Sequence, residues 1–216
     1  MAGASVNLLA MQPSSVIKLT PEEFFAWLPG QEGRYELVDG EVVMMAGAGR
    51  RHDYIVVNLI STIDGLMRGG PCQTFTGDTF VATSATTRRM PDVGIDCGKP
   101  DDDSLAADRP SLVVEVLSPT TRAMDVTIKL QEYQSLDSLD YVLLVDTEIP
   151  KVHFHSRRDD RSWTAVVVEG LDSSLALEKL NIELKLSDIY RGLEFRPKPK
   201  LVQVEPAEPG STFGPK

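Results

Sequence analysis

Apolar residues along the chain follow two patterns, a spacing of three and four residues and short continuous runs, which predict helices alternating with strands. The helical spacing is clearest over residues 52–68, where an amphipathic helix is expected to end at Gly69-Gly70. Four positions form its apolar face: Ile55, Leu59, Ile63 and Leu66. This helix should therefore pack one side against the core of the domain.

The segment before this helix predicts a short helix and then a hairpin. Residues 20–23 (Thr-Pro-Glu-Glu) combine an N-cap, a proline at the first helical position and a capping-box glutamate. Pro29-Gly30 should end the helix about two turns later. Runs at residues 34–38 and 41–45 flank Asp39-Gly40, a dipeptide typical of two-residue β-turns, so these runs are expected to pair as a hairpin.

The rest of the chain predicts a strand-rich region with one long helix over residues 120–136, capped within residues 118–121, and a short helix near residues 187–193. Because the long helix joins two apolar runs, the strands that these runs form should be parallel. Strands are expected at residues 72–76, 78–83, 92–96, 112–117, 141–145, 151–156 and 162–168. The predicted fold class is therefore α/β, a central mixed sheet flanked by helices, with an N-terminal helix and hairpin and extra C-terminal strands.

Length and composition favour one folded domain between two extensions. The chain has 216 residues, of which 42% are hydrophobic and 25% charged, near the average for globular domains. No internal linker interrupts residues 19–195, which we expect to form the domain. Residues 1–18 lack a clear period, and residues 196–216 contain five prolines, so both segments are expected to be extensions.

Charge and cysteine content limit the function classes. The net charge is −10, which argues against a protein that coats nucleic acid by bulk charge but not against a metal enzyme acting on phosphates. Cys72 and Cys97 have no C-x-x-C spacing, so we expect two reduced thiols and a cytoplasmic location, with one disulfide as an alternative that nothing else favours. No run reaches the roughly 18 apolar residues of a membrane span, and no signal peptide is expected.

Two carboxylates carry the candidate chemistry. Glu115 lies in the middle of a run that otherwise predicts a buried strand, and a buried carboxylate needs a cation or hydrogen bonds. Asp92 follows Pro91, which suits the start of a strand, so Asp92 should lie at a strand end. If the two strands are neighbours, both carboxylates could hold one hard cation. The alternatives are a surface ion pair for Glu115 and a turn role for Asp92.

Lys129 is the candidate cation of this site. It lies in the predicted helix that follows the Glu115 strand, and Asp125 and Tyr133 share its helical face at four-residue spacing. A crossover helix can direct one side chain toward the carboxyl end of its strand, where ligands of α/β sheets gather. The alternative is a surface Asp–Lys pair.

These residues resemble the Uma-type restriction endonuclease family of bacteria, a branch of the PD-(D/E)XK nuclease superfamily. The resemblance covers residues ~20–146 in the order of the family and is specific as a set of short motifs. The resembling positions are residues 20–24, 34–40, His52, Pro91-Asp92, residues 115–119, Asp125, Lys129, Tyr133 and residues 144–146.

The resemblance implies an α/β core with a mixed sheet, Asp92 and Glu115 as magnesium ligands, and Glu36 as an additional acid near the metal. A hairpin salt bridge explains Glu36 equally well, and a structural role is expected for His52. The chain departs from the superfamily pattern at Leu117, where the usual E-x-K motif has lysine. In this branch the role of that lysine is taken to pass to Lys129.

The expected activity is endonucleolytic hydrolysis of DNA by a metal-activated water, with Mg²⁺, or Mn²⁺ in its place, bound by Asp92, Glu115 and the Val116 carbonyl. Lys129 would orient the water and offset charge on the phosphate. A homodimer is compatible with cutting both strands. Five arginines are candidate phosphate contacts: Arg50, Arg51, Arg88, Arg89 and Arg122. The alternatives are an inactive nuclease-like fold that binds nucleic acid or protein, and a hydrolase of smaller phosphate esters.

Overall fold

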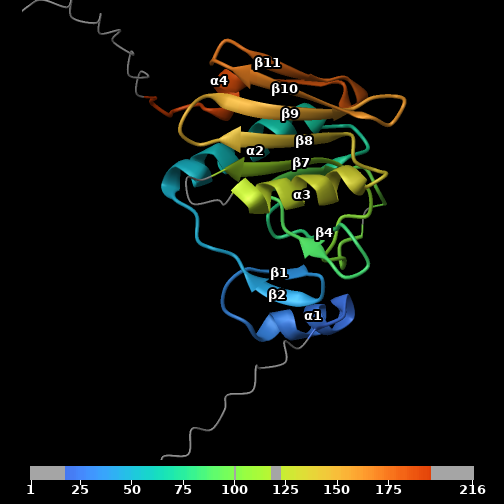
Figure 1. The fold of residues 1–216 in the computed structure, drawn as a ribbon. Helices are drawn as coiled ribbons and strands as arrows, with labels where there is room; N and C mark the ends of the chain where they lie inside the picture. The colour runs from blue at the N-terminus through green and yellow to red at the C-terminus, as the bar shows by residue number, and fades with distance from the viewer. Residues whose placement is uncertain (1–17, 100, 118–122, 196–216) are drawn as a thin grey trace, which may run out of the picture.

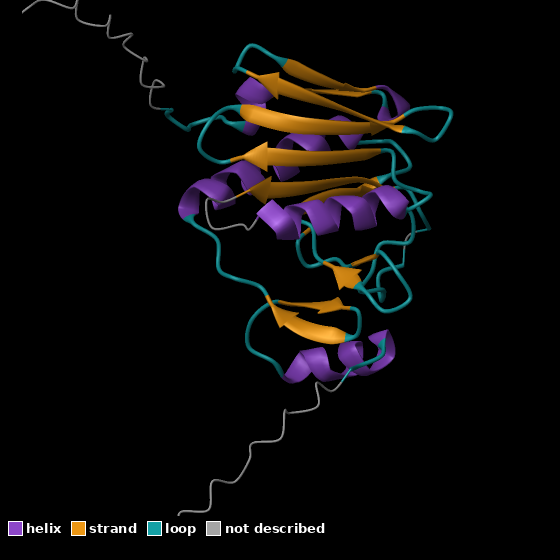
Figure 2. Ribbon diagram, in the orientation of Figure 1, coloured by secondary structure: helices purple, strands orange, loops and turns teal. Residues whose placement is uncertain are grey.

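A six-stranded mixed sheet organises the fold in the computed structural model, which describes residues 18–99, 101–117 and 123–195 (Figures 1 and 2). Strands β7 and β8 are parallel, as the crossover helix predicts, and every other neighbouring pair in this sheet is antiparallel. Across the sheet the strands are β10 (Trp163–Glu169), β9 (Lys151–Arg157), β8 (Tyr141–Asp146), β7 (Pro110–Leu117), β6 (Val93–Asp96) and β3 (Gln73–Thr76). The α/β class and the mixed sheet are thereby confirmed.

Two helices cover opposite faces of this sheet (Figure 1). Helix α2 (Arg50–Met67) packs against the face that carries Val114 and Val116, and α3 (Ala123–Ser135) packs against the face that carries Val113. Because successive side chains of a strand point to opposite faces, Glu115 lies on the α3 face. The sheet and α3 thus enclose the one acidic residue at the centre of β7.

Three of the four residues that were predicted to form the apolar face of α2 are buried in the core. Ile55, Leu59 and Ile63 are fully buried, whereas Leu66 is 44% exposed, so its assignment to the core was wrong. Met67 takes the last core position instead, because four residues after Ile63 the 3.6-residue turn brings Met67 to the sheet. The helix ends before Gly69, which has a φ of +79°.

A smaller four-stranded sheet holds the predicted hairpin (Figure 1). Asp39 and Gly40 both have positive φ, as a tight two-residue turn requires. Thr20 and Glu23 form the predicted capping box of α1 (Pro21–Trp27), which a short 3₁₀ helix, η1 (Leu28–Gly30), extends. In order the strands are β2 (Glu41–Met44), β1 (Tyr35–Val38), β5 (Arg88–Arg89) and β4 (Val81–Ala82). The short strand β5 was not predicted, and it brings distant residues beside β1.

The C-terminal part of the described chain adds a two-stranded sheet and two short helices. These elements are β11 (Ser174–Leu177), the 3₁₀ helix η2 (Glu178–Leu180), β12 (Ile182–Lys185) and α4 (Leu186–Ile189). Asn58 of α2 donates hydrogen bonds to the carbonyls of Ile189 and Arg191, which fixes this segment behind the large sheet. The predicted helix near residues 187–193 is therefore shorter and begins one residue earlier.

The cysteines form a disulfide, which corrects the expectation of two reduced thiols. β3 and β6 pair antiparallel, with Gln73 opposite Asp96, so the next pair outward is Cys72 and Cys97. Sequence spacing alone could not give this register. No helix within the described residues is long and apolar enough to cross a lipid bilayer. The predicted features at residues 1–17, 118–121 and 196–216 lie outside the described residues.

Candidate functional site

Glu115 projects from the centre of β7 toward α3 and is largely enclosed. Its side chain is 13% exposed, and its Oε1 accepts hydrogen bonds from the Tyr133 hydroxyl at 2.7 Å and the Lys129 ammonium at 3.4 Å. Burial raises the pKa of the Glu115 carboxyl to about 7; the Lys129 ammonium opposes this rise and the Asp92 carboxylate adds to it. Glu115 is therefore a largely enclosed acid whose ionised form is disfavoured by burial and stabilised by Lys129.

Asp92 lies beside Glu115 because of the strand register. Val93 of β6 pairs with Val114 of β7, so Asp92 lies one step along the same antiparallel ladder, opposite Glu115. Its Oδ2 accepts the Val116 N–H at 2.8 Å and lies 3.2 Å from Nε2 of His52, at the start of α2. The structure thus brings together the two carboxylates that the sequence singled out, each on its own strand.

Lys129 points into the site and not to solvent. The residue is 8% exposed, and its ammonium lies 2.9 Å from Oε1 of Glu36 and 3.4 Å from Oε1 of Glu115. Helix α3 places it there by crossing over the face of the sheet on which Glu115 lies (Figure 1). The alternative of a surface Asp–Lys pair is therefore wrong for the lysine, and the side chain of Asp125 lies outside the described residues.

Glu36 is held by two cations and one backbone N–H. Its strand partner in the hairpin is Val43, so no hairpin salt bridge forms there. Oε1 accepts the Lys129 ammonium and the Met90 N–H, and Oε2 accepts Arg89 Nη1 at 2.9 Å. Burial acts to raise the pKa of Glu36, but the Lys129 ammonium and the Met90 N–H outweigh it and hold that pKa below its usual range. Both oxygens are thus engaged, and Glu36 orients Lys129.

Arg89 is not a surface arginine, which corrects its assignment as a phosphate contact. It is 3% exposed and binds Glu132 of α3 through two hydrogen bonds, of 2.7 and 2.6 Å. Its third bond reaches Glu36, so Arg89 links the small sheet to the helix that carries Lys129. A phosphate outside the protein has no access to this guanidinium in the folded chain.

The other described arginines of this prediction differ in their exposure and in their contacts. Arg50 is exposed and lines a pocket of about 540 Å³ that opens on Asp92 and His52. Arg51 donates to the carbonyls of Thr147 and Glu194 and stacks on Phe195, a structural set of contacts. Arg88 of β5 donates to the backbone carbonyls of Ser84 and Thr87, in the segment just before the strand. Arg122 lies outside the described residues. Of the four that the structure describes, Arg50 is best placed near the acidic pair.

Several residues of the site were not expected from the sequence. His52 was assigned a structural role, yet it lies beside Asp92. Glu132 carried no signal, because a glutamate on a helix is ordinarily solvated. Arg34, which also lines the 540 Å³ pocket, lies on Gly77 and donates to its carbonyl. For Tyr133 the available signal was its four-residue spacing from Lys129 on one helical face.

The donor set suits a hard divalent cation. Among the described residues no three His, Cys, Asp or Glu side chains form a metal cluster, so a cation here would have two carboxylates plus backbone and water ligands. Within the same residues, Asp92 Oδ1 and Glu115 Oε2 have no hydrogen-bond partner, whereas the second oxygen of each is held in place. Each carboxylate therefore keeps one oxygen available for a ligand.

The net charge of the described cluster also favours a divalent cation. Four carboxylates (Glu36, Asp92, Glu115 and Glu132) face two cations (Arg89 and Lys129), a formal balance of −4 + 2 = −2 when all are ionised. Isolated buried charge is costly, and one divalent cation would neutralise this excess. The residues present thus fit a metal of the Mg²⁺ or Mn²⁺ type.

The fold is of the nuclease-like α/β class. The structure resembles the crystal structure of a protein from Anabaena variabilis, described as a putative nuclease belonging to DUF820, with a TM-score of 0.65 and 17% sequence identity. The likeness covers 80% of this chain and 97% of that one. At this identity the comparison shows the fold.

The sequence places the chain within that class. It belongs to the Uma2 family, described as putative restriction endonucleases, whose model matches residues 21–187. An uncharacterised protein of Synechocystis sp. is 31% identical over 191 residues, which cover 87% of this chain and 100% of that protein. A second uncharacterised protein of the same organism is 25% identical, over 76% of this chain and 95% of its own length. The resemblance drawn from the short motifs is confirmed.

Proposed function

We propose that this protein is a metal-dependent endonuclease that hydrolyses phosphodiester bonds of DNA. The observation that carries the proposal is the pairing of Asp92 and Glu115 on adjacent strands, each with one unengaged oxygen, beside the buried ammonium of Lys129. Membership of a family described as putative restriction endonucleases supports the same reaction class. The −2 balance of the cluster supports a divalent cation as the cofactor.

Asp92, Glu115 and the Val116 carbonyl would hold the cation. When bound, Mg²⁺ or Mn²⁺ supplies Lewis-acid polarisation of the phosphate and lowers the pKa of a bound water. The chain's own residues do the positioning. Val116 N–H and His52 fix the Asp92 carboxylate through Oδ2, and Tyr133 fixes Glu115 through Oε1.

Lys129 would act on the substrate side of the site. Glu36 already holds the Lys129 ammonium in place. The lysine side chain therefore loses little further conformational entropy when its ammonium stabilises the negative charge that develops on the phosphate oxygens. In a largely enclosed site such a cation stabilises that charge more than it would in water. Glu36 and Arg89 act through Lys129 and are positioning residues.

The 540 Å³ pocket beside Asp92 is the proposed entry for the DNA backbone. Arg34 and Arg50 line it with two guanidinium groups, and the other titratable residues of its lining are His52, Asp53, Asp78 and Asp92. Local arginines of this kind can hold phosphates although the whole chain carries −10. Arg34 and Arg50 of this pocket therefore take the place of Arg89 as the proposed phosphate contacts.

Incubation of the purified chain with supercoiled plasmid and Mg²⁺ or Mn²⁺ tests the proposal. Wild type should nick the plasmid, and chelation by EDTA should stop the reaction. Asp92→Asn and Lys129→Met should be inactive, whereas Asp159→Asn and Lys99→Met, which change exposed residues away from the site, should cleave as wild type. Equal activity of all five proteins would reveal a contaminating nuclease and remove the proposal.

Binding without cleavage would favour the second candidate, an inactive nuclease-like fold. Leu117 at the usual lysine position and the acidic net charge are the observations behind that candidate. A mobility-shift assay with duplex DNA in Ca²⁺ separates the two, because it reports affinity when the cleavage step is blocked. Retention of DNA together with an intact plasmid in Mg²⁺ and in Mn²⁺ would assign the chain to binding.

A further inference from the structure

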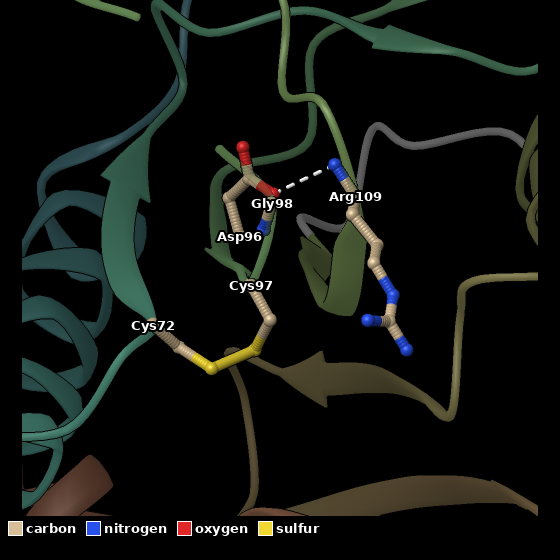
Figure 3. Close-up of a disulfide and its surroundings, with 5 residues drawn as sticks. All are labelled: Cys72, Asp96, Cys97, Gly98 and Arg109. Carbon is tan, nitrogen blue, oxygen red and sulfur yellow. Dashed lines mark hydrogen bonds between the residues drawn. A yellow bond between two sulfur atoms is a disulfide. The ribbon is translucent and has the colours of Figure 1, made fainter. Parts of the chain in front are cut away.

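The disulfide lies far from the acidic pair along β6, at the opposite end of the strand. Cys72 and Cys97 are the only cysteines in the chain, and they continue the β3–β6 ladder beyond its outermost pair (Figure 3). Asp92 precedes the first residue of β6, and Cys97 follows its last. Chemistry at this bond can therefore be studied apart from the proposed cleavage site.

The bond is accessible from the surface. Both cysteines are only partly buried, and both line a pocket of about 470 Å³ at the end of the sheet. Cys72 also lines a second pocket, of about 340 Å³. Disulfides that reagents can reach are the ones open to exchange, whereas those sealed in a core are protected. Cys72 lines both pockets and Cys97 lines the larger one, so Cys72 is taken as the residue that a reagent attacks.

The larger pocket carries positive charge beside Cys97. The Cys97 N–H donates to the Arg109 carbonyl at 3.0 Å, so the two residues are neighbours across β6 and β7. Figure 3 shows the Arg109 side chain extending on the same side as the Cys97 sulfur. Within the described residues the Arg109 guanidinium has no acidic partner, whereas Lys179, in the same pocket, pairs with Asp140 at 2.8 Å.

Such a cation has two effects on thiol chemistry. It stabilises the thiolate of a nearby cysteine, which makes that cysteine a better leaving group in exchange. It also attracts reagents that carry carboxylates, and this attraction weakens with salt. Both effects favour a small anionic thiol over a neutral one.

We propose that Cys72–Cys97 is a thiol–disulfide exchange site for a small thiol that carries carboxylates. The reagent thiolate attacks Sγ of Cys72, the Sγ–Sγ bond breaks, and Cys97 leaves as a thiolate beside Arg109. A second reagent thiolate then attacks the reagent sulfur of the mixed disulfide and releases Cys72. Two protein thiols and one oxidised reagent dimer result, so two electrons pass from two reagent thiols to the protein.

Glutathione is the test probe, and 2-mercaptoethanol is its neutral counterpart. Mass spectrometry of the full chain after iodoacetamide treatment should show no alkylated cysteine before reduction and two after it. Reduction by glutathione should be slowed roughly three- to tenfold in Arg109→Gln at low salt. The effect should be smaller with 2-mercaptoethanol, and Arg158→Gln, at an exposed arginine elsewhere, should match wild type.

Trapping of the mixed disulfide tests the order of attack. Oxidised wild type reacted briefly with glutathione and then with iodoacetamide should carry glutathione on Cys72 and the alkyl group on Cys97, and glutathione found mainly on Cys97 would contradict this order. Two alkylated cysteines in the untreated protein, or equal glutathione rates for Arg109→Gln and Arg158→Gln, would overturn the proposal. Both readouts are independent of DNA cleavage, so loss of the proposed nuclease function would leave this result unaffected.

Discussion

Replacing Arg89 by methionine is expected to destabilise the protein strongly, because this guanidinium neutralises the buried carboxylate of Glu36 and the partly buried carboxylate of Glu132. Arg89 donates two hydrogen bonds to Glu132 and one to Glu36, and it is 3% exposed. Removal of one partner of a buried ion pair costs about 3–5 kcal/mol, since the remaining charge stays desolvated. The Glu132 side chain is 23% exposed and can recover some hydration, so the lower end applies, about 3 kcal/mol.

Urea unfolding followed by circular dichroism, in metal-free buffer, measures this loss. For a domain of this size about 3 kcal/mol corresponds to a fall in Tm of roughly 6–12 °C. The exposed Arg158→Met is the matched control and should stay within about 0.5 kcal/mol of wild type. Glu132→Leu and the double variant complete a double-mutant cycle, and the double variant should lose less than the sum of the single variants because the two side chains are in contact.

The opposite reading of Arg89, as a phosphate contact, predicts a different outcome. A surface arginine that binds DNA would leave stability unchanged and reduce the salt dependence of DNA binding when replaced. A loss below about 1 kcal/mol in Arg89→Met, together with additivity in the cycle, would refute the buried network. Strong destabilisation together with coupling would leave Arg34 and Arg50 as the arginines to test for DNA affinity.

Three shorter predictions follow from other parts of the structure. Mg²⁺ or Mn²⁺ should stabilise wild type by about 2.7 kcal/mol at a hundredfold excess over Kd, and Asp92→Asn should abolish this stabilisation. An equal rise of Tm with metal in both proteins, measured by calorimetry, would contradict this prediction. Serine at both Cys72 and Cys97 should lower the unfolding free energy by roughly 3.5 kcal/mol, the chain-entropy value for cysteines 25 residues apart; equal urea midpoints for oxidised wild type and variant would exclude it. Burial acts to raise the pKa of Asp146, but hydrogen bonds from backbone N–H groups and from Lys151 outweigh it and lower that pKa. The ionised Asp146 therefore stabilises the folded state above the unfolded pKa of about 3.9, and this contribution is lost as the pH falls further. Asp146→Asn should therefore show a shallower loss of stability below about pH 4 in urea midpoints, and an unchanged slope would contradict this assignment.

The sequence was sufficient for features that short-range rules determine. The Asp39-Gly40 turn, the capping box at Thr20 and the spacing of α2 each depend on residues within a few positions; the turn and the capping box formed as predicted, and α2 did so except at Leu66. Glu115 was also detectable, because a charged residue inside an apolar strand conflicts with its surroundings. Such a conflict can be recognised in a sequence without knowledge of the partner that resolves it.

Features that depend on distant pairing were not predictable. Arg89 and Glu36 are 53 residues apart, and they meet because the short strand β5, which has no periodic signal, pairs with β1. Cys72 and Cys97 meet only through the register of β3 on β6. His52 lies beside Asp92 because α2 begins at the end of the strand ladder. In each case the missing information was which strands are neighbours, a property of the whole fold.

The position of the lysine follows from the same network. A lysine at 117 would lie on the Glu115 face of β7, since residues two apart on a strand share a face, but here Leu117 packs against the apolar cluster under α3. Lys129 instead reaches Glu115 from the helix, and it can do so because Glu36 offers its ammonium a second carboxylate. Glu36 in turn needs Arg89 as the counter-charge for its other oxygen. The small β2-β1-β5-β4 sheet supplies Glu36 and Arg89, and through these contacts it orients the Lys129 ammonium in the proposed site.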